Sequence, residues 1–81
     1  MYNLYVLRLS DNSYYIGSTE NLEKRLREHN RKRVKSTKNK LPFVLIYTES
    51  HTNRSEAQTR EYQIKKWKSK DAIERLINAK K

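Results

Sequence analysis

The sequence predicts a small α+β domain: a three-stranded β-sheet packed by three α-helices, in the order β-β-α-β-α-α. Apolar residues form short runs near the start of the chain and after Pro42, as in buried strands. Elsewhere they recur every three or four residues, as on one face of a helix. No repeat, linker or change of composition divides the 81 residues, so we expect a single domain over residues 1–81.

The chain begins with a predicted hairpin. Residues 2–9 (YNLYVLRL) are apolar on both alternating sets, which is typical of a strand covered on two faces. Residues 10–13 (SDNS) have turn composition, and residues 14–16 form the returning strand. We expect Gly17 to end this strand, in a conformation or a close approach that a Cβ would forbid.

The middle of the chain predicts a helix, a loop and a strand. Residues 19–29 have helical periodicity, with Ser18 or Thr19 as the capping side chain. Residues 30–41 are polar, basic and without a period, so we expect a loop. Residues 43–47 (FVLIY) form a continuous apolar run, which predicts the third strand.

Two helices are predicted to complete the chain. Residues 53–56 (NRSE) resemble a capping box and open a helix that runs from about residue 55 to residue 68. A short final helix over residues 69–77 has an apolar stripe, formed by Ala72, Ile73, Leu76 and Ile77.

Composition narrows the classes of function. The chain has 19 Lys and Arg against 9 Asp and Glu, a net charge of +10 that favours an anionic partner such as nucleic acid. It has no Cys, which excludes disulfides and thiolate chemistry. No apolar run approaches the ~20 residues of a membrane span, and the first residues lack the pattern of a signal peptide. We therefore expect a cytoplasmic protein with no membrane partner.

Three polar side chains lie where the helical pattern asks for apolar ones. Arg25 and His29 fall on the same arc as the two leucines of the first predicted helix. Glu61 falls on the arc of Ala57 and Ile64 in the second. A buried carboxylate is costly unless it is paired, hydrogen-bonded or bound to a metal. Each position alone also has a structural explanation: a snorkelling Arg, a hydrogen-bonded core His, and a Glu paired with Arg25.

Two tyrosines of the predicted hairpin are further candidates. Tyr5 and Tyr15 share a face of the sheet if the loop between the strands has three or five residues. A two-residue turn at Asp11 and Asn12 places them on opposite faces. The sequence leaves both arrangements open, and packing is the simpler role for a strand tyrosine.

Together these residues resemble the GIY-YIG nuclease superfamily. Asn3-Leu4-Tyr5 and Tyr15-Ile16-Gly17 resemble the two tripeptides of its name, with Asn3 in place of the first glycine. Arg25 follows eight residues after Gly17, and His29 completes an R-x3-H arrangement. Glu61 stands in a string (REYQIK) that resembles the metal-binding helix of the family. The chain is most similar to small stand-alone members.

The resemblance implies a metal-dependent endonuclease that hydrolyses DNA with low sequence specificity, in repair or recombination. Glu61 would hold Mg²⁺ or another divalent cation such as Mn²⁺, with no small-molecule cofactor. Arg25 would stabilise negative charge on the scissile phosphate. Either Tyr5 or Tyr15 would be the general base, and His29 would relay a proton or orient the tyrosine; the sequence does not choose.

Basic residues flank these candidates. Six lie in the loop after the first helix, and we expect them, with one lysine of the second helix, to track a phosphate backbone. These residues are Arg31, Lys32, Arg33, Lys35, Lys38, Lys40 and Lys65. DNA is the expected partner, although the charge also suits RNA. The same charge suits a non-catalytic nucleic-acid-binding module, and the sequence does not indicate the oligomeric state.

Overall fold

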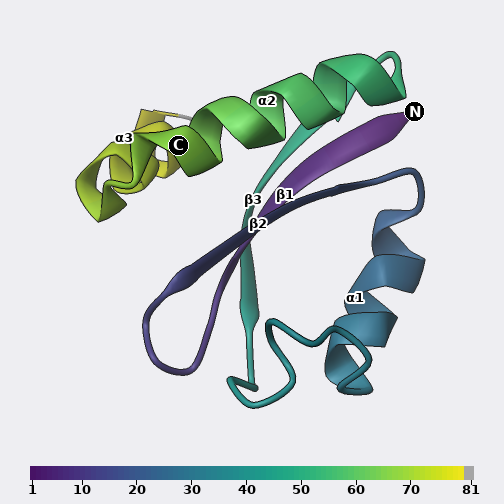
Figure 1. The fold of residues 1–81 in the computed structure, drawn as a ribbon, viewed down its shortest axis with the longest axis vertical. Helices are drawn as coiled ribbons and strands as arrows, with labels where there is room; N and C mark the ends of the chain where they lie inside the picture. The colour runs from purple at the N-terminus through teal and green to yellow at the C-terminus, as the bar shows by residue number, and fades with distance from the viewer. Residues whose placement is uncertain (80–81) are drawn as a thin grey trace.

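The computed structural model describes residues 1–79. These residues form three strands and three helices in the predicted order (Figure 1). The elements are β1 (Tyr2–Arg8), β2 (Tyr14–Thr19), α1 (Leu22–Asn30), β3 (Val44–His51), α2 (Arg54–Trp67) and α3 (Lys70–Ala79). The predicted α+β class and element order are confirmed. None of the helices within residues 1–79 is long and apolar enough to cross a membrane.

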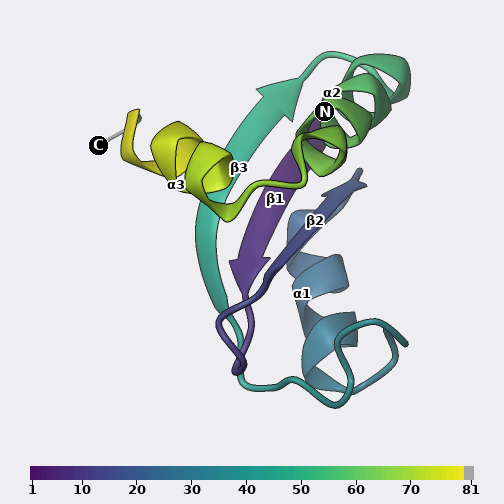
Figure 2. The ribbon, with the colours of Figure 1, turned by 60° about the vertical axis from the view of Figure 1, so that its left-hand side comes forward.

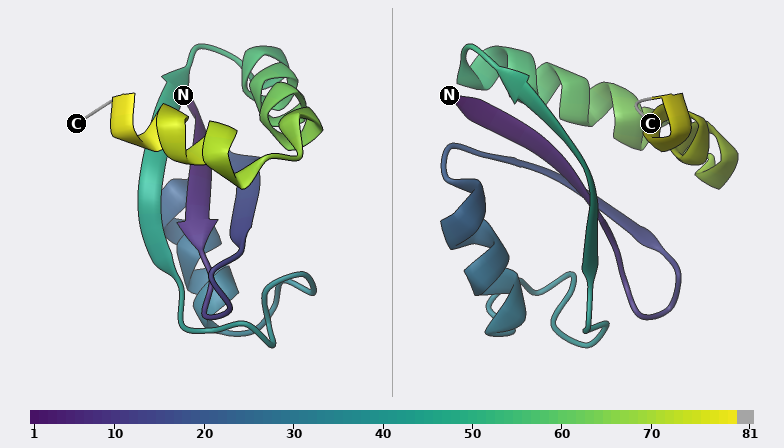
Figure 3. Two further views of the ribbon diagram at one scale, coloured as in Figure 1. Left: turned by 90° about the vertical axis from the view of Figure 1, so that its left-hand side faces the viewer. Right: turned by 180° about the vertical axis from the view of Figure 1, so that it is seen from behind.

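The strands form one antiparallel sheet in the order β2-β1-β3, with β1 in the centre (Figure 2). Helix α1 covers one face, and α2 and α3 cover the other (Figure 3, left). Leu4 and Val6 of β1 point to the α2 face, whereas Tyr5 and Leu7 point to the α1 face. All four are buried, which explains why β1 is apolar at alternating and intervening positions alike.

The hairpin has a five-residue connection between its strands. Arg8 lies opposite Tyr14, and Asn12 takes a left-handed conformation with φ of 66°. In this register Tyr15 lies opposite Leu7, so Tyr5 and Tyr15 share the α1 face. The loop length thus decides the question that the sequence left open.

Strand β2 continues past its glycine. We expected Gly17 to end the strand, but pairing extends to Thr19, which lies opposite Asn3. The extension is possible because Gly17 does not take a left-handed conformation. The glycine therefore serves the second of its two expected roles, a close approach of another group.

Side-chain caps set the helix boundaries. Helix α1 begins at Leu22 because Asn21 accepts a hydrogen bond from the Lys24 backbone N–H at 3.0 Å, so the expected caps at Ser18 and Thr19 are wrong. Helix α2 is capped as predicted from its NRSE box: Asn53 accepts from the backbone N–H three residues later, at 2.9 Å. Strand β3 is longer than expected and runs to His51.

Candidate active site

Tyr5 occupies the centre of a hydrogen-bonded group on the α1 face. Its hydroxyl oxygen lies 3.0 Å from Nε2 of His29 and accepts a hydrogen bond from Nε of Arg25 at 3.4 Å. The ring of Tyr15 lies 6.1 Å from the Tyr5 ring and 5.0 Å from the imidazole. Four of the five catalytic candidates are therefore brought together, although they come from two strands and a helix.

Gly17 makes room for Tyr5 in this group. A Cβ at Gly17 would lie 2.6 Å from the Tyr5 hydroxyl oxygen and 2.7 Å from Cζ. The phenol end of Tyr5, on the central strand, therefore lies against the backbone of the edge strand β2. No residue with a side chain fits here unless Tyr5 moves away from its hydrogen-bond partners.

His29 is fully buried, and both of its ring nitrogens have partners. Nδ1 lies 2.8 Å from the hydroxyl oxygen of Thr37, which is also fully buried. The Thr37 hydroxyl in turn lies 3.4 Å from the backbone carbonyl of Val34. Thr37 was not among the residues predicted from the sequence. The sequence feature that could have indicated it is Val34, the single apolar residue in the basic stretch 30–40. Val34 is buried, and the turn that buries it also buries Thr37.

The environment fixes the protonation of these groups near neutral pH. Burial raises the pKa of Tyr5 to about 12, although the Arg25 hydrogen bond opposes the rise. The bond to Tyr5 raises the pKa of Arg25 above its usual range. Burial, with the Arg25 charge, lowers the pKa of His29. The group therefore consists of a neutral phenol, a cationic guanidinium and a neutral imidazole.

Glu61 lies apart from this group, on the α2 face. Its carboxylate accepts hydrogen bonds from the Ser18 hydroxyl at 2.7 Å and from the Lys65 ammonium at 2.5 Å. Ser18 lies opposite Leu4 and therefore points away from Tyr5. The ion pair between Glu61 and Arg25 that the sequence allowed is not formed: Arg25 pairs with Glu28 at 3.3 Å.

The two faces meet around the end of β2. A cavity of about 370 Å³ there is lined by both Ser18 and Arg25, together with residues 19–21 that lead into α1. Because β2 is an edge strand, a group bound in this cavity reaches Ser18, which donates to Glu61, and Arg25, which donates to Tyr5. Of the five candidate residues, Arg25 lines this cavity directly, and Ser18, the hydrogen-bond partner of Glu61, lines it from the other face.

The donor chemistry at Glu61 suits a hard divalent cation. Within residues 1–79, no three His, Cys, Asp or Glu side chains are grouped so that they could hold a metal ion. Mg²⁺ needs no such group, because it keeps several waters and commonly takes one or two carboxylates along with substrate phosphate. The Glu61 side chain is 22% exposed and carries an ammonium on one oxygen, so a cation can reach it by displacing Lys65.

The predicted basic loop is exposed, as a nucleic-acid contact requires. All six cationic residues between positions 31 and 40 are exposed. Lys40 forms an ion pair with Asp11 of the hairpin at 3.4 Å, which connects this loop to the sheet. The seventh expected contact, Lys65, is also exposed but is paired with Glu61.

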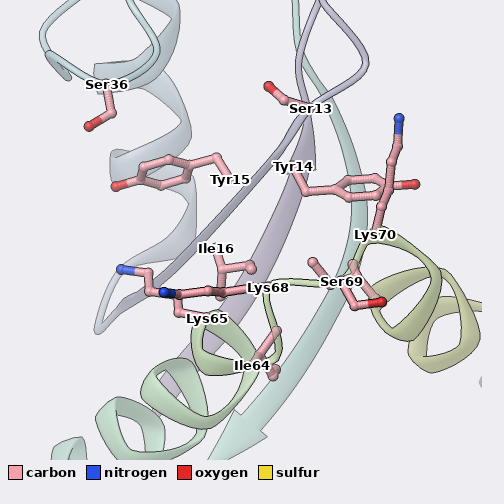
Figure 4. A pocket seen from close by; sticks show the side chains of 11 residues that line it. Ser13, Tyr14, Tyr15, Ile16, Ser36, Ile64, Lys65, Lys68, Ser69 and Lys70 are labelled. Carbon is pink, nitrogen blue, oxygen red and sulfur yellow. The ribbon is translucent and has the colours of Figure 1, made fainter.

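A larger groove of about 530 Å³ opens beside Tyr15. It lies between β2, the basic loop and the junction of α2 with α3, and three lysines line it. In Figure 4, Tyr15, Lys65 and Lys68 extend to the same side of the groove, whereas Tyr14 and Lys70 point the other way. Cations and an aromatic ring therefore border the approach to the candidate site.

Known proteins resemble the chain along nearly its whole length. The family profile described as "GIY-YIG catalytic domain" matches residues 1–76. A UPF0213 protein of Clostridium perfringens is 42% identical over 78 residues, which cover 95% of this chain and 83% of that protein. Another, of Staphylococcus haemolyticus, is 46% identical over 63 residues, covering 76% of this chain and 77% of the relative. The solution NMR structure of a UPF0213 protein of Bacillus halodurans superimposes with a TM-score of 0.64 at 30% identity, covering 99% of this chain and 86% of that one.

Proposed function

Since the chain belongs to the GIY-YIG catalytic domain family, which is a nuclease family, we propose that it is a metal-dependent endonuclease acting on DNA phosphodiester bonds. The observation that carries this proposal is the position of the Tyr5 hydroxyl between Arg25 and His29. A cation, an ionisable hydroxyl and a neutral base in one hydrogen-bonded chain are the parts that phosphodiester hydrolysis needs.

Arg25 supports the electrostatic part of the reaction. Its side chain is about one third exposed and lines the cavity at the end of β2, so a phosphate can reach it. A guanidinium binds phosphate oxygens with two parallel hydrogen bonds, and its charge stabilises the negative charge that develops during attack. Arg25 turns from Glu28 and Tyr5 to the scissile phosphate when substrate binds.

Tyr5 is the tyrosine that we assign as proton acceptor, because its hydroxyl oxygen lies within hydrogen-bond distance of both Arg25 and His29. A pKa near 12 keeps Tyr5 protonated before reaction. Its hydroxyl therefore accepts the proton of the attacking water as its own proton passes to Nε2 of His29. Tyr5 is 1% exposed, so this transfer follows the displacement of Arg25 from the hydroxyl by the phosphate.

Glu61 is the residue that would hold the divalent ion, with the Ser18 hydroxyl orienting its carboxylate. A bound Mg²⁺ or Mn²⁺ supplies Lewis-acid stabilisation of phosphate charge and of the leaving oxygen. Lys65 pairs with Glu61, and it would be free to join the exposed cations that contact the DNA backbone if a divalent ion took its place on the carboxylate. These backbone contacts carry no base readout, which gives low sequence specificity. We further propose that it is a cytoplasmic protein of DNA repair or recombination.

The proposal is tested by cleavage of supercoiled plasmid and single-stranded DNA with Mg²⁺ or Mn²⁺. Glu61→Gln and Arg25→Ala are each expected to lower the cleavage rate by about 100-fold or more. Glu74→Gln is the matched control, since this carboxylate lies on α3 and accepts from Tyr14, away from the site. If the wild-type protein cuts no faster than Glu61→Gln with either metal, the enzyme proposal is wrong. Unchanged DNA affinity in that case would identify a binding module.

A further inference from the structure

The imidazole of His29 has a hydrogen-bond partner at each nitrogen, and this raises the question of which nitrogen carries the hydrogen. A neutral imidazole has one N–H donor and one acceptor nitrogen. Tyr5 and Thr37, the two partners, carry hydroxyls that can donate or accept. The proposed function requires the imidazole to accept the Tyr5 proton, and it can do so only if Nε2 carries no hydrogen.

The ends of the chain of hydrogen bonds decide its direction. At one end, the Nε–H of Arg25 can only donate, so the Tyr5 oxygen accepts there and its own hydrogen is free for His29. At the other end, the Val34 carbonyl can only accept, so the Thr37 hydroxyl donates to it and its oxygen accepts from His29. Both ends give the same order: Arg25 to Tyr5 to Nε2, and Nδ1–H to Thr37 to Val34.

We propose that Thr37 is a positioning residue that holds His29 as the Nδ1–H tautomer, so that the lone pair on Nε2 faces the Tyr5 hydroxyl. This inference rests on the proposed nuclease function. In the transfer step the Tyr5 O–H bond breaks and an Nε2–H bond forms, which leaves imidazolium and a phenolate that takes the proton of the attacking water. The bond from Nδ1–H to Thr37 persists throughout and prevents rotation of the ring.

The position of Thr37 in the chain connects this role with substrate binding. Thr37 is buried in the basic loop, between the exposed residues Lys35 and Lys38. The turn that presents these cations to a phosphate backbone therefore also supplies the buried hydroxyl. The backbone of the turn is held by hydrogen bonds from the Thr37 and Lys38 N–H groups to the Val34 carbonyl.

Two variants test the proposal. Thr37→Val keeps the shape and removes the hydroxyl, whereas Thr37→Ser keeps the hydroxyl and removes the methyl group. The tautomer of His29 is read from the ¹⁵N shifts of its ring nitrogens in the folded protein without DNA. We expect Nδ1–H in the wild type and in Thr37→Ser, and a gain of the Nε2–H form in Thr37→Val. Cleavage should fall about 10- to 100-fold in Thr37→Val at unchanged DNA affinity, and Thr37→Ser should recover most of it.

The two readouts separate this inference from the nuclease proposal. An Nε2–H tautomer in the wild type, or an unchanged tautomer in Thr37→Val, overturns the role of Thr37 whether or not the protein cuts DNA. Loss of cleavage in Thr37→Ser equal to that in Thr37→Val also overturns it. If the tautomer responds as expected but no variant cuts DNA, the nuclease proposal fails and the positioning of His29 stands. The wild-type spectrum tests the tautomer even if Thr37→Val does not fold.

Discussion

The two faces of the sheet are stabilised in different ways. The α2 face is largely aliphatic, and its buried cluster consists of Leu4, Val6, Ile16, Tyr47, Ile64 and Ile73. The α1 face has a smaller cluster, and the one buried residue of α1 is His29. Hydrophobic burial is non-directional and tolerates exchange of similar side chains, whereas hydrogen bonds fix atoms in place. The first face thus stabilises the fold, and the second holds Tyr5, Arg25 and His29 in a defined geometry.

The comparison also explains the separation of Glu61 from the other candidates. A chain of 81 residues has little apolar material, and the larger of its two buried clusters lies on the α2 face. Glu61 lies at the border of that aliphatic face, where Ser18 and Lys65 satisfy its charge. The end of the edge strand β2 is the place where residues of both faces, Ser18 and Arg25, line one cavity.

The largest effect is expected from a cavity in the aliphatic face. Ile64 is fully buried, and Ile64→Ala should lower the free energy of unfolding by about 2–5 kcal/mol. Ile64→Val removes one methylene and should cost about 0.5–1.5 kcal/mol. Urea unfolding followed by circular dichroism measures both. If Ile64→Ala lowered the free energy of unfolding by less than Ile64→Val does, packing of α2 on the sheet would not be a main source of stability.

A steric clash on the α1 face should lower the free energy of unfolding less than the Ile64 cavity does, and should lower the cleavage rate more. Gly17→Ala places a methyl group against the Tyr5 hydroxyl, and overpacking of this kind costs about 1–3 kcal/mol. The phenol must move from His29 and Arg25, so we expect cleavage to fall further than stability does. Ser50→Ala, at an exposed position of β3, should change the free energy of unfolding by less than about 0.5 kcal/mol. Full cleavage in a folded Gly17→Ala protein would contradict the close approach.

The dependence of stability on pH should separate the two faces. The pKa of His29 is lowered from 6.5 by burial and by Arg25, so the unfolded chain binds the proton more readily. The stability that neutral His29 contributes is present above pH 6.5 and is lost as the pH falls below it. On the α2 face, burial of Glu49 opposes its ionisation, but hydrogen bonds from Arg60, Tyr47 and His51 outweigh this and lower the pKa of Glu49 from 4.5.

The stability that ionised Glu49 contributes is therefore kept while His29 becomes protonated, and it is lost only as the pH falls below about 4.5. The free energy of unfolding, measured by urea titration between pH 8 and pH 2, should show both steps. His29→Gln should remove the upper step and leave the lower one. If the loss of stability below pH 6.5 were as large in His29→Gln as in the wild type, it would come from a group other than His29.

The smallest effect on the fold is expected from the basic loop. Lys35 and Lys38 are exposed, so replacing both with Ala should leave the urea midpoint nearly unchanged. DNA affinity should become less dependent on salt, with the slope of log K against log salt reduced by about 1 for each lysine that binds a phosphate in the wild type. Arg8→Ala is the control, because Arg8 lies on the other face of the sheet, in a cavity that it shares with Glu74 and Ile77 of α3. An equal change of slope in Arg8→Ala would show that only the net charge matters.

Much of the site was predictable because local patterns report which way a side chain faces on its own element. The helical arc predicted that His29 and Arg25 point inward, and they do. The inward arc of Ala57 and Ile64 likewise placed Glu61 next to the sheet. The cap of α1 was harder to predict, since Ser18, Thr19 and Asn21 can all cap a helix and only the path of β2 selects Asn21.

The sequence by itself determined the order of the elements, the family resemblance and the residues that lie on buried faces. Only the tertiary structure decided that Tyr5 and Tyr15 share a face, that Glu61 lies on the opposite one, and that Thr37 holds His29. The physical reason is the range of the interactions. Periodicity and capping act over a few residues, whereas strand register and the choice of sheet face depend on contacts between residues far apart in the chain.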